Sequence, residues 1–162
     1  MDDHGSPVLA RLLAVHGDVL LATHAEHGDA TAIVRIEAIV ELMCFARDDA
    51  ALRFEMLMDL TAVDHVAREP RFDVVYHLYS IEHGHRLRIK LGVSEATCAA
   101  PSLIDVWPGA AWLEREVWDM YGIRFPGNPD QRRLLLYEEF EGHPLRKDYP
   151  KEKRQPLIGP EN

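Results

Sequence analysis

The segment from Arg71 to Glu82 constrains the fold most strongly, because apolar side chains occur on both faces of its alternating pattern. One face of the expected strand carries Phe72, Val74, Tyr76 and Leu78, and the other carries Val75, His77, Tyr79 and Ile81. This pattern is typical of an interior strand in a sheet that is covered on both sides. After the turn at residues 83–85, the segment Arg86–Val93 is expected to return as a neighbouring strand.

Other regular elements are expected before and after these two strands. Ser6 and Pro7 are typical of an N-cap and first helical position, and the helix should end near Gly17. The remaining predictions are a hairpin over residues 19–36, a helix over 37–48, a strand over 54–62 and a helix over 110–121. This order predicts an α+β domain over residues 1–121, with a single mixed or antiparallel sheet and flanking helices.

The chain changes character after Tyr121. Six of the ten prolines lie in residues 122–162, and a mostly irregular segment of about 40 residues is unusual within a compact domain. Disordered chains are poor in large apolar residues. This segment retains Phe125, Leu134, Leu135, Leu136, Tyr137, Phe140, Leu145 and Tyr149. The sequence therefore predicts an extended, mostly irregular C-terminal arm, residues 122–162, that docks on partner proteins.

The formal net charge of −9 argues against nucleic acid as a partner, because phosphate binding requires a basic surface. Residues 1–64 contribute −8 and residues 131–162 contribute +1, so the tail either pairs with acidic surface elsewhere or is solvated. The acidic N-terminal residues are not typical of a signal peptide, and no apolar run reaches about 18 residues. Any membrane association is therefore expected to occur through partners.

No residue set predicts a cofactor, a metal site or a catalytic centre in this chain. Cys44 and Cys98 are far apart and lack the spacing of an iron–sulfur or zinc site. His83 and His85 flank a glycine, but no third metal ligand is evident. Phosphate-binding loops and common catalytic motifs are also missing from the sequence.

Glu116 and Asp119 are three residues apart and share one face of the expected helix over 110–121. Paired carboxylates can act as acid and base when burial raises one pKa. The nearby Arg115 and Arg133 favour a different interpretation, in which an arginine–carboxylate network fixes the helix to the arm or to a partner. The alternative is a free-standing enzyme that uses Glu116, Asp119 and His143 and that requires a pocket joining them.

The run from Arg146 to Pro150 combines cations, a carboxylate and an aromatic ring, a composition that favours an interface over a solvated surface. His143 lies between glycine and proline, so its backbone is restricted and it could act as a pivot of the arm. The predicted inter-subunit or arm-positioning residues are Glu114, Arg115, Glu116, Asp119, Arg132, Arg133, His143, Arg146, Lys147, Asp148 and Tyr149.

Several of these residues fall in motifs that resemble a known family. The motifs are Glu114-Arg115-Glu116, Asp119-Met120-Tyr121-Gly122-Ile123, Pro129-Asp130, Arg132-Arg133-Leu134-Leu135 and the run from Gly142 to Pro150. Together they resemble the 30-kDa subunit family of respiratory complex I, which in bacteria is the C subunit of NADH-quinone oxidoreductase. The chain departs from the family at Asn128, where histidine is usual, and at Gln131, where leucine is common.

The resemblance implies a non-catalytic peripheral-arm subunit of a proton-pumping enzyme that passes electrons from NADH through FMN and iron–sulfur clusters to quinone. Those cofactors are expected in partner subunits. The implied partners are the 49-kDa-type subunit, which helps to form the quinone site, and neighbouring iron–sulfur subunits. The implied location is the cytoplasmic face of the bacterial inner membrane. An equivalent subunit of a membrane-bound hydrogenase or of another non-NADH dehydrogenase remains an alternative.

Overall fold

The computed structural model describes residues 1–156, so the last six residues of the predicted arm lie outside it. Within that range the predicted α+β fold is confirmed, with a five-stranded mixed sheet and three α-helices. The elements are α1 (Pro7–His16), β1 (Leu20–His24), β2 (Thr31–Val34), α2 (Ile39–Asp48), β3 (Met56–Asp64), β4 (Phe72–Tyr79), β5 (Arg86–Val93) and α3 (Ala110–Tyr121). Short 3-10 helices occupy Glu26–Gly28 and Ile36–Ala38.

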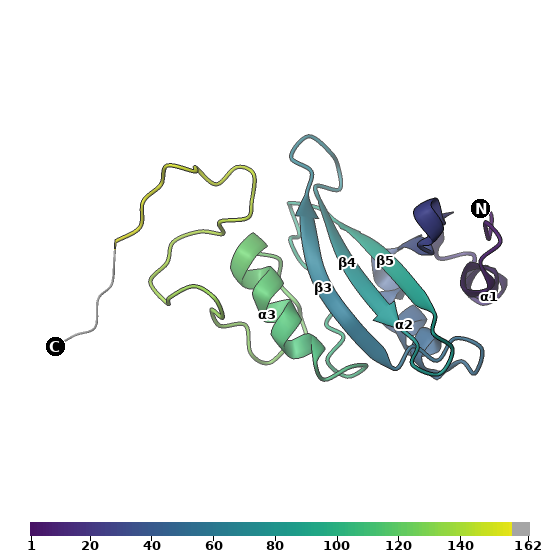
Figure 1. Ribbon diagram of the computed structural model, residues 1–162. Coiled ribbons are helices and arrows are strands. Elements are labelled where there is room, and N and C mark those ends of the chain that lie inside the picture. The colour runs from purple at the N-terminus through teal and green to yellow at the C-terminus, as the bar shows by residue number, and fades with distance from the viewer. Residues whose placement is uncertain (157–162) are drawn as a thin grey trace.

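The strands are arranged in the order β1-β2-β5-β4-β3, with α3 next to β3 at one edge of the sheet and α1 near β1 at the other (Figure 1). The pair β2–β5 is parallel, and the other neighbouring strands are antiparallel. The predicted hairpins β1–β2 and β4–β5 are both present. Because β4 lies between β5 and β3, its predicted interior position is confirmed.

Local sequence signals explain where α1 begins and where α3 ends. The side-chain oxygen of Ser6 accepts a hydrogen bond from the N–H of Leu9 at 3.4 Å, and Pro7 occupies the first turn of α1. At the other end of the domain, α3 ends at Gly122, whose φ of 79° is in the left-handed region that glycine favours. Its N–H donates to the carbonyl of Trp118 at 2.8 Å.

One face of the sheet forms the main hydrophobic core. The side chains of β4 on the face that contains Phe72 and Tyr76 are almost completely buried. Most of their cross-strand neighbours on β5 and β3 are also apolar. Leu9 of α1 and Leu42 of α2 belong to the same continuous core. Burial on this scale is the dominant favourable term in folding.

The second face of β4 is less covered than its apolar pattern predicts. Val75 is buried, but His77 and Tyr79 are only half-buried and Ile81 is exposed. Their cross-strand neighbours on β5 include Lys90, Arg88 and Arg86, whose charged ends need water or a partner. The prediction that both faces are covered was therefore wrong for this face, because the neighbouring strand is cationic there.

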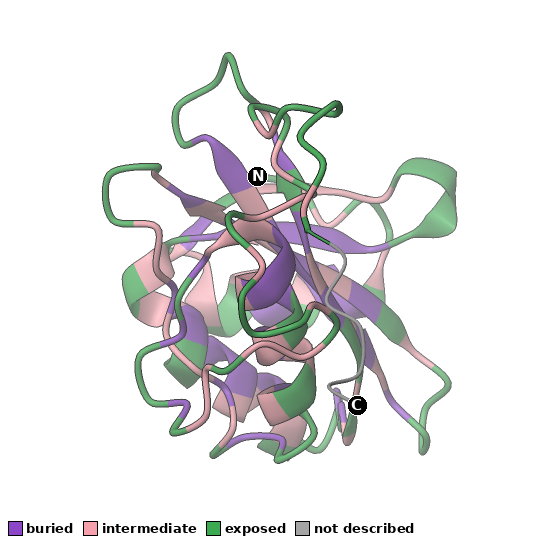
Figure 2. Ribbon diagram, turned by 90° about the vertical axis from the view of Figure 1, so that its left-hand side faces the viewer, coloured by how far each residue is buried: buried purple, intermediate pink, exposed green. Residues whose placement is uncertain are grey.

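The chain directly after α3 packs into the core instead of leaving the domain. Ile123 and Phe125 are completely buried, and Arg124 forms a short parallel bridge with Ala99. The arm beyond residue 128 consists mainly of exposed and half-buried residues (Figure 2). Residues 122–128 therefore contribute to the body of the structure. The division of the chain after residue 121 stays a prediction.

A pair of truncations tests how far the body of the protein extends. Phe125→Ala should lower the free energy of unfolding by about 3–5 kcal/mol, because it leaves a cavity in the core. Leu135→Ala, at a residue that is 61% exposed, should change it by less than about 0.5 kcal/mol. Urea denaturation followed by circular dichroism measures both values. Similar small effects would show that residues 122–128 are not part of the cooperative unit.

Candidate functional site

The candidate site is the contact between α3 and the arm, and its centre is the carboxylate of Asp119. This residue is completely buried. One carboxylate oxygen accepts a hydrogen bond from the guanidinium of Arg133 at 2.9 Å. The other accepts from the backbone N–H groups of Leu134, Leu135 and Leu136 at 3.0, 2.8 and 3.0 Å. Successive N–H groups directed at one oxygen form an anion-binding turn, here supplied entirely by the arm.

These donors keep Asp119 ionised. Burial alone would raise the pKa of Asp119, but the hydrogen bonds from Arg133 and from the three backbone N–H groups outweigh it and lower the pKa below its usual range. The stabilisation is therefore present above the unfolded-state pKa of about 3.9 and is lost as the pH falls through the folded-state value. A group held as an anion in this way is suited to fixing structure rather than to donating protons.

The predicted arginine–carboxylate network forms within the chain. Arg133 also donates to the carbonyl of Phe140 at 2.6 Å, and its guanidinium lies 5.4 Å from the centre of the Trp118 ring. Arg115 donates to the carbonyl of Arg133 at 2.8 Å and pairs with Asp130 at 3.3 Å. Both arginines thus join the helix to the arm at several points.

His143 marks the place where the arm crosses the end of α3. Its Nδ1 lies 3.0 Å from the carbonyl oxygen of Asp119, which can only accept, so Nδ1 carries the proton. The imidazole lies directly over Gly122, where an added Cβ would be 2.7 Å from a ring carbon. Glycine at position 122 therefore serves both the left-handed end of the helix and this close approach.

A second ionic cluster holds the arm further along the chain. It consists of Asp64, Arg71 and Glu95 from the body and Arg146 and Asp148 from the arm. The Arg71 guanidinium lies 2.8 Å from Asp64 and 3.0 Å from Asp148, and Arg146 lies 2.6 Å from Glu95. The arm therefore contributes one cation and one anion to a cluster built on the buried pair of Arg71 and Asp64.

The pKa shifts in this cluster show how strongly its carboxylates are held. Hydrogen bonds from Arg146 and then Arg71 hold the pKa of Asp148 well below its usual range. The guanidinium of Arg71 also lowers the pKa of Asp64, and the backbone N–H of Lys147 donates to Asp64 at 2.8 Å. Asp64 and Arg71 were not among the residues predicted from the sequence, although charged residues at the ends of apolar strands were a usable signal.

Glu114 occupies a different environment inside the body. Its carboxylate accepts hydrogen bonds from the Leu103 N–H at 2.7 Å, the Ser102 hydroxyl at 2.8 Å and the Asn128 side-chain amide at 3.0 Å. Burial raises the pKa of Glu114, and these hydrogen bonds oppose the rise. Glu114 thus connects the chain before α3 to the start of the arm, and Asn128 acts there as an amide donor.

Other predicted residues face outward. Glu116 is exposed, as are Arg132 and Lys147, and Arg132 pairs with Asp130 at 2.8 Å. Tyr149 is half-buried, and its ring stacks on that of Phe140 with 6.0 Å between centroids. The predicted set therefore divides into residues that position the arm and residues that remain available to a partner.

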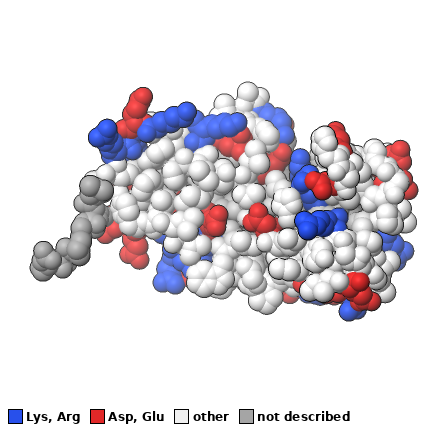
Figure 3. Space-filling model, in the orientation of Figure 1, with Lys and Arg blue, Asp and Glu red and all other residues white. Residues whose placement is uncertain are grey.

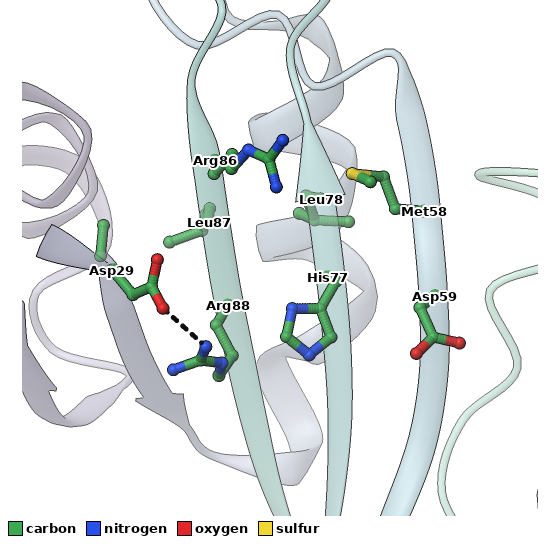
Figure 4. A pocket seen from close by; sticks show the side chains of 9 residues that line it. Asp29, Met58, Asp59, His77, Leu78, Arg86, Leu87 and Arg88 are labelled. Atoms are coloured by element: carbon green, nitrogen blue, oxygen red, sulfur yellow. Dashed lines mark hydrogen bonds and ion pairs between the residues drawn. The ribbon is translucent and has the colours of Figure 1, made fainter. Parts of the chain in front are cut away.

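A hollow with a volume of about 360 Å³ lies on the open face of the sheet. Arg88 of β5 reaches Asp29 at 3.0 Å, and the ring of His77 lies between Arg88 and Asp59 (Figure 4). Burial and then the charge of Arg88 lower the pKa of His77. Opposite charges alternate across this hollow, so it has no strong preference for a cation or an anion.

The acid–base enzyme requires one pocket that contains Glu116, Asp119 and His143. None of the three lines the hollow on the sheet. Asp119 is completely buried and Glu116 is exposed, and His143 binds the backbone of Asp119 rather than its carboxylate. The arrangement is suited to holding the arm and not to presenting an acid and a base to a substrate.

Across residues 1–156, no group of three or more histidine, cysteine, aspartate or glutamate side chains is placed to hold a metal ion. The helices of this same range are too short or too polar to cross a membrane.

Asp119→Ala should release the arm from α3. The substitution removes the carboxylate that Arg133 pairs with and leaves three backbone N–H groups without an acceptor, at a cost on the order of 3 kcal/mol. Tryptic cleavage between residues 132 and 154 should become faster by about one to two orders of magnitude, as followed by mass spectrometry. Glu116→Ala, an exposed carboxylate on the same helix, is the control and should leave the rate unchanged. Equal rates for the two variants would contradict the role of Asp119.

Asn128→Asp should destabilise the protein in a pH-dependent way. It places a second carboxylate about 3.0 Å from the buried Glu114, which should lower the free energy of unfolding by about 2–4 kcal/mol at pH 7. At pH 5 the loss should be smaller, because like charges raise one pKa and the folded state binds a proton. Urea denaturation at both pH values measures the effect. Asn128→Ala introduces no charge and removes only one neutral donor to Glu114, so its cost should change less between the two pH values.

Comparison with known proteins supports a single family. The family model described as "Respiratory-chain NADH dehydrogenase, 30 Kd subunit" matches residues 32–155. The C subunit of the NADH-quinone oxidoreductase of Roseiflexus castenholzii is 51% identical over 143 residues, which cover 88% of this chain and 82% of the relative. The same subunit of Caulobacter vibrioides is 47% identical over 146 residues, covering 90% and 71%.

Two solved structures share the fold. A trypsin-resistant fragment of Nqo5 is 30% identical with a TM-score of 0.68, and the match covers 76% of this chain and 98% of the fragment. A chain of the membrane-bound sulfane sulfur reductase, an archaeal respiratory membrane complex, has a TM-score of 0.78 at 22% identity and covers 91% and 86%. This second likeness concerns the fold alone. On the family match and the identities together, the chain belongs to the 30-kDa subunit family of the respiratory-chain NADH dehydrogenase, whose bacterial members are the C subunits of NADH-quinone oxidoreductase.

Proposed function

We propose that this chain is a non-catalytic, structural subunit of a proton-translocating NADH-quinone oxidoreductase. In this role it braces the 49-kDa-type subunit, which helps to form the quinone site, and it contacts neighbouring iron–sulfur subunits. Electrons pass from NADH through FMN and iron–sulfur clusters to quinone in those partners. The chain lies peripherally at the cytoplasmic face of the bacterial inner membrane and is held there by its partners.

One observation carries this proposal: the arm is fixed on its inner side and exposes large apolar residues on its outer side. Asp119 and Arg71 hold its inner side. The exposed residues are Leu135 at 61% and Leu145 at 52%, together with Trp112 of α3 at 61%. Exposed leucine side chains on an ordered but irregular segment, next to an exposed tryptophan on the helix that holds it, are typical of a surface that a partner covers.

One solved relative supports a protease-resistant body. The Nqo5 structure is described as a trypsin-resistant fragment, and it matches 76% of this chain. A resistant body that is shorter than the whole chain is consistent with this extent.

NADH is favoured as the electron donor of the complex over hydrogen or another donor. The relatives cited above, at 47% identity or more, are named as subunits of NADH-quinone oxidoreductase. The likeness to the sulfane sulfur reductase chain, at 22% identity, concerns the fold and does not favour its reaction.

The proposal is tested by comparing the isolated chain with the chain in its membrane-bound complex. Trypsin should cut the arm after its lysine and arginine residues in the isolated chain, and the complex should protect residues 122–156. Arg146→Ala removes the contacts with Glu95 and Asp148 and should reduce recovery of the complex by roughly fivefold.

The control for this experiment is Arg35→Ala, which removes an exposed cation from the body. It should leave recovery and quinone reductase activity unchanged. If the arm is equally protected in the isolated chain, or if Arg146→Ala assembles as well as the wild type, the proposed docking role of the arm is wrong.

A further inference from the structure

The end of the arm carries a charge opposite to that of the remaining chain. Residues 146–154 contain five lysine or arginine residues and two acidic residues, a net charge of +3, so the other residues sum to −12. Lysine and arginine side chains are aligned along the outer edge of the arm (Figure 3). Such a local reversal of sign on an acidic protein suggests a specific electrostatic partner.

The fold of the arm separates these charges by direction. Asp148 pairs inward with Arg71 and with Arg146, which itself reaches Glu95 of the body. Lys147, Lys151 and Arg154, by contrast, are exposed and form no ion pair within residues 1–156. We name these three residues the basic edge.

The basic edge is attached to an ordered backbone. The ring of Tyr149 stacks on Phe140, and the side-chain amide of Gln155 donates to the Tyr149 hydroxyl at 3.0 Å and to the Glu141 carbonyl at 3.0 Å. The hydroxyl of Tyr137 donates to the carbonyl of Pro156 at 3.0 Å. The cations are thus presented from a fixed segment, which reduces the entropy lost when a partner binds.

We propose that the basic edge binds an acidic surface of a neighbouring protein subunit. The inference rests on the proposed function and adds the chemistry of one contact. An anionic bilayer fits less well, because the remaining chain at −12 is repelled by it. In addition, the rings of Tyr149 and Phe140 stack on each other and are not free to insert among lipids. Complementary charges of this kind orient partners and set the register of docking.

The test reverses the charge of two residues at the end of the basic edge. The control reverses the charge of two arginine residues elsewhere on the chain. Lys151→Glu/Arg154→Glu should lower retention of the chain on its membrane-bound complex by about tenfold during washing at moderate salt. Arg35→Glu/Arg86→Glu makes the same change in net charge at exposed body residues without ion pairs in the described chain, and it should be retained like the wild type.

The retention should also depend on salt in a characteristic way. Wild-type retention should fall as salt rises, whereas the neutral variant Lys151→Gln/Arg154→Gln should be weaker at low salt and less sensitive to salt. All three variants should keep the wild-type urea midpoint, because the altered side chains are exposed.

The outcomes separate this inference from the proposed function. If the wild-type chain is not recovered with the complex at all, the proposed function fails. If the wild type is recovered and Lys151→Glu/Arg154→Glu is retained equally, only the basic-edge contact is overturned. Binding of the full chain to phosphatidylglycerol vesicles that is lost in Lys151→Glu/Arg154→Glu would also overturn it and assign the edge to lipid.

Discussion

The arm depends on one buried carboxylate. An irregular segment cannot satisfy its backbone N–H groups through a helix or a sheet, and unsatisfied groups are costly when they are removed from water. Asp119 accepts from three consecutive N–H groups of the arm and from Arg133. A single side chain of α3 thus supplies the acceptors that a helix or a sheet would otherwise provide. The arm can therefore be ordered without being regular.

Three buried carboxylates show how the hydrogen-bond donors around a carboxylate set the direction of its pKa shift. Asp119 and Asp64 each have an arginine and backbone donors, and their pKa values are lowered. Glu114 has only neutral donors, and its pKa is raised by burial. The first two hold the arm as fixed anions, whereas the third connects neutral groups inside the body, where an added negative charge would be poorly tolerated.

The arm therefore has two sides with different chemistry. Its polar contacts with α3 and with Arg71 are directed inward, and its exposed leucines and the basic edge are directed outward. This division fits a segment that is positioned by its own domain and that another subunit is proposed to bind. The charged and aromatic residues on the inner side of the arm position it, through Asp119, Arg133 and the cluster around Arg71.

The sequence by itself determined the elements of the fold and the part of the chain where the site lies. Period-two alternation and helical spacing are local properties, so α1, β4 and α3 were predictable within a few residues. The motifs after residue 113 also identified the family. Only the tertiary structure decided the partners of each charge, such as Arg71 with Asp148, because residues 77 positions apart meet through chain folding and no local pattern encodes their pairing. It likewise decided that Ile123 and Phe125 enter the core and that the second face of β4 stays open, since burial depends on what packs above a residue.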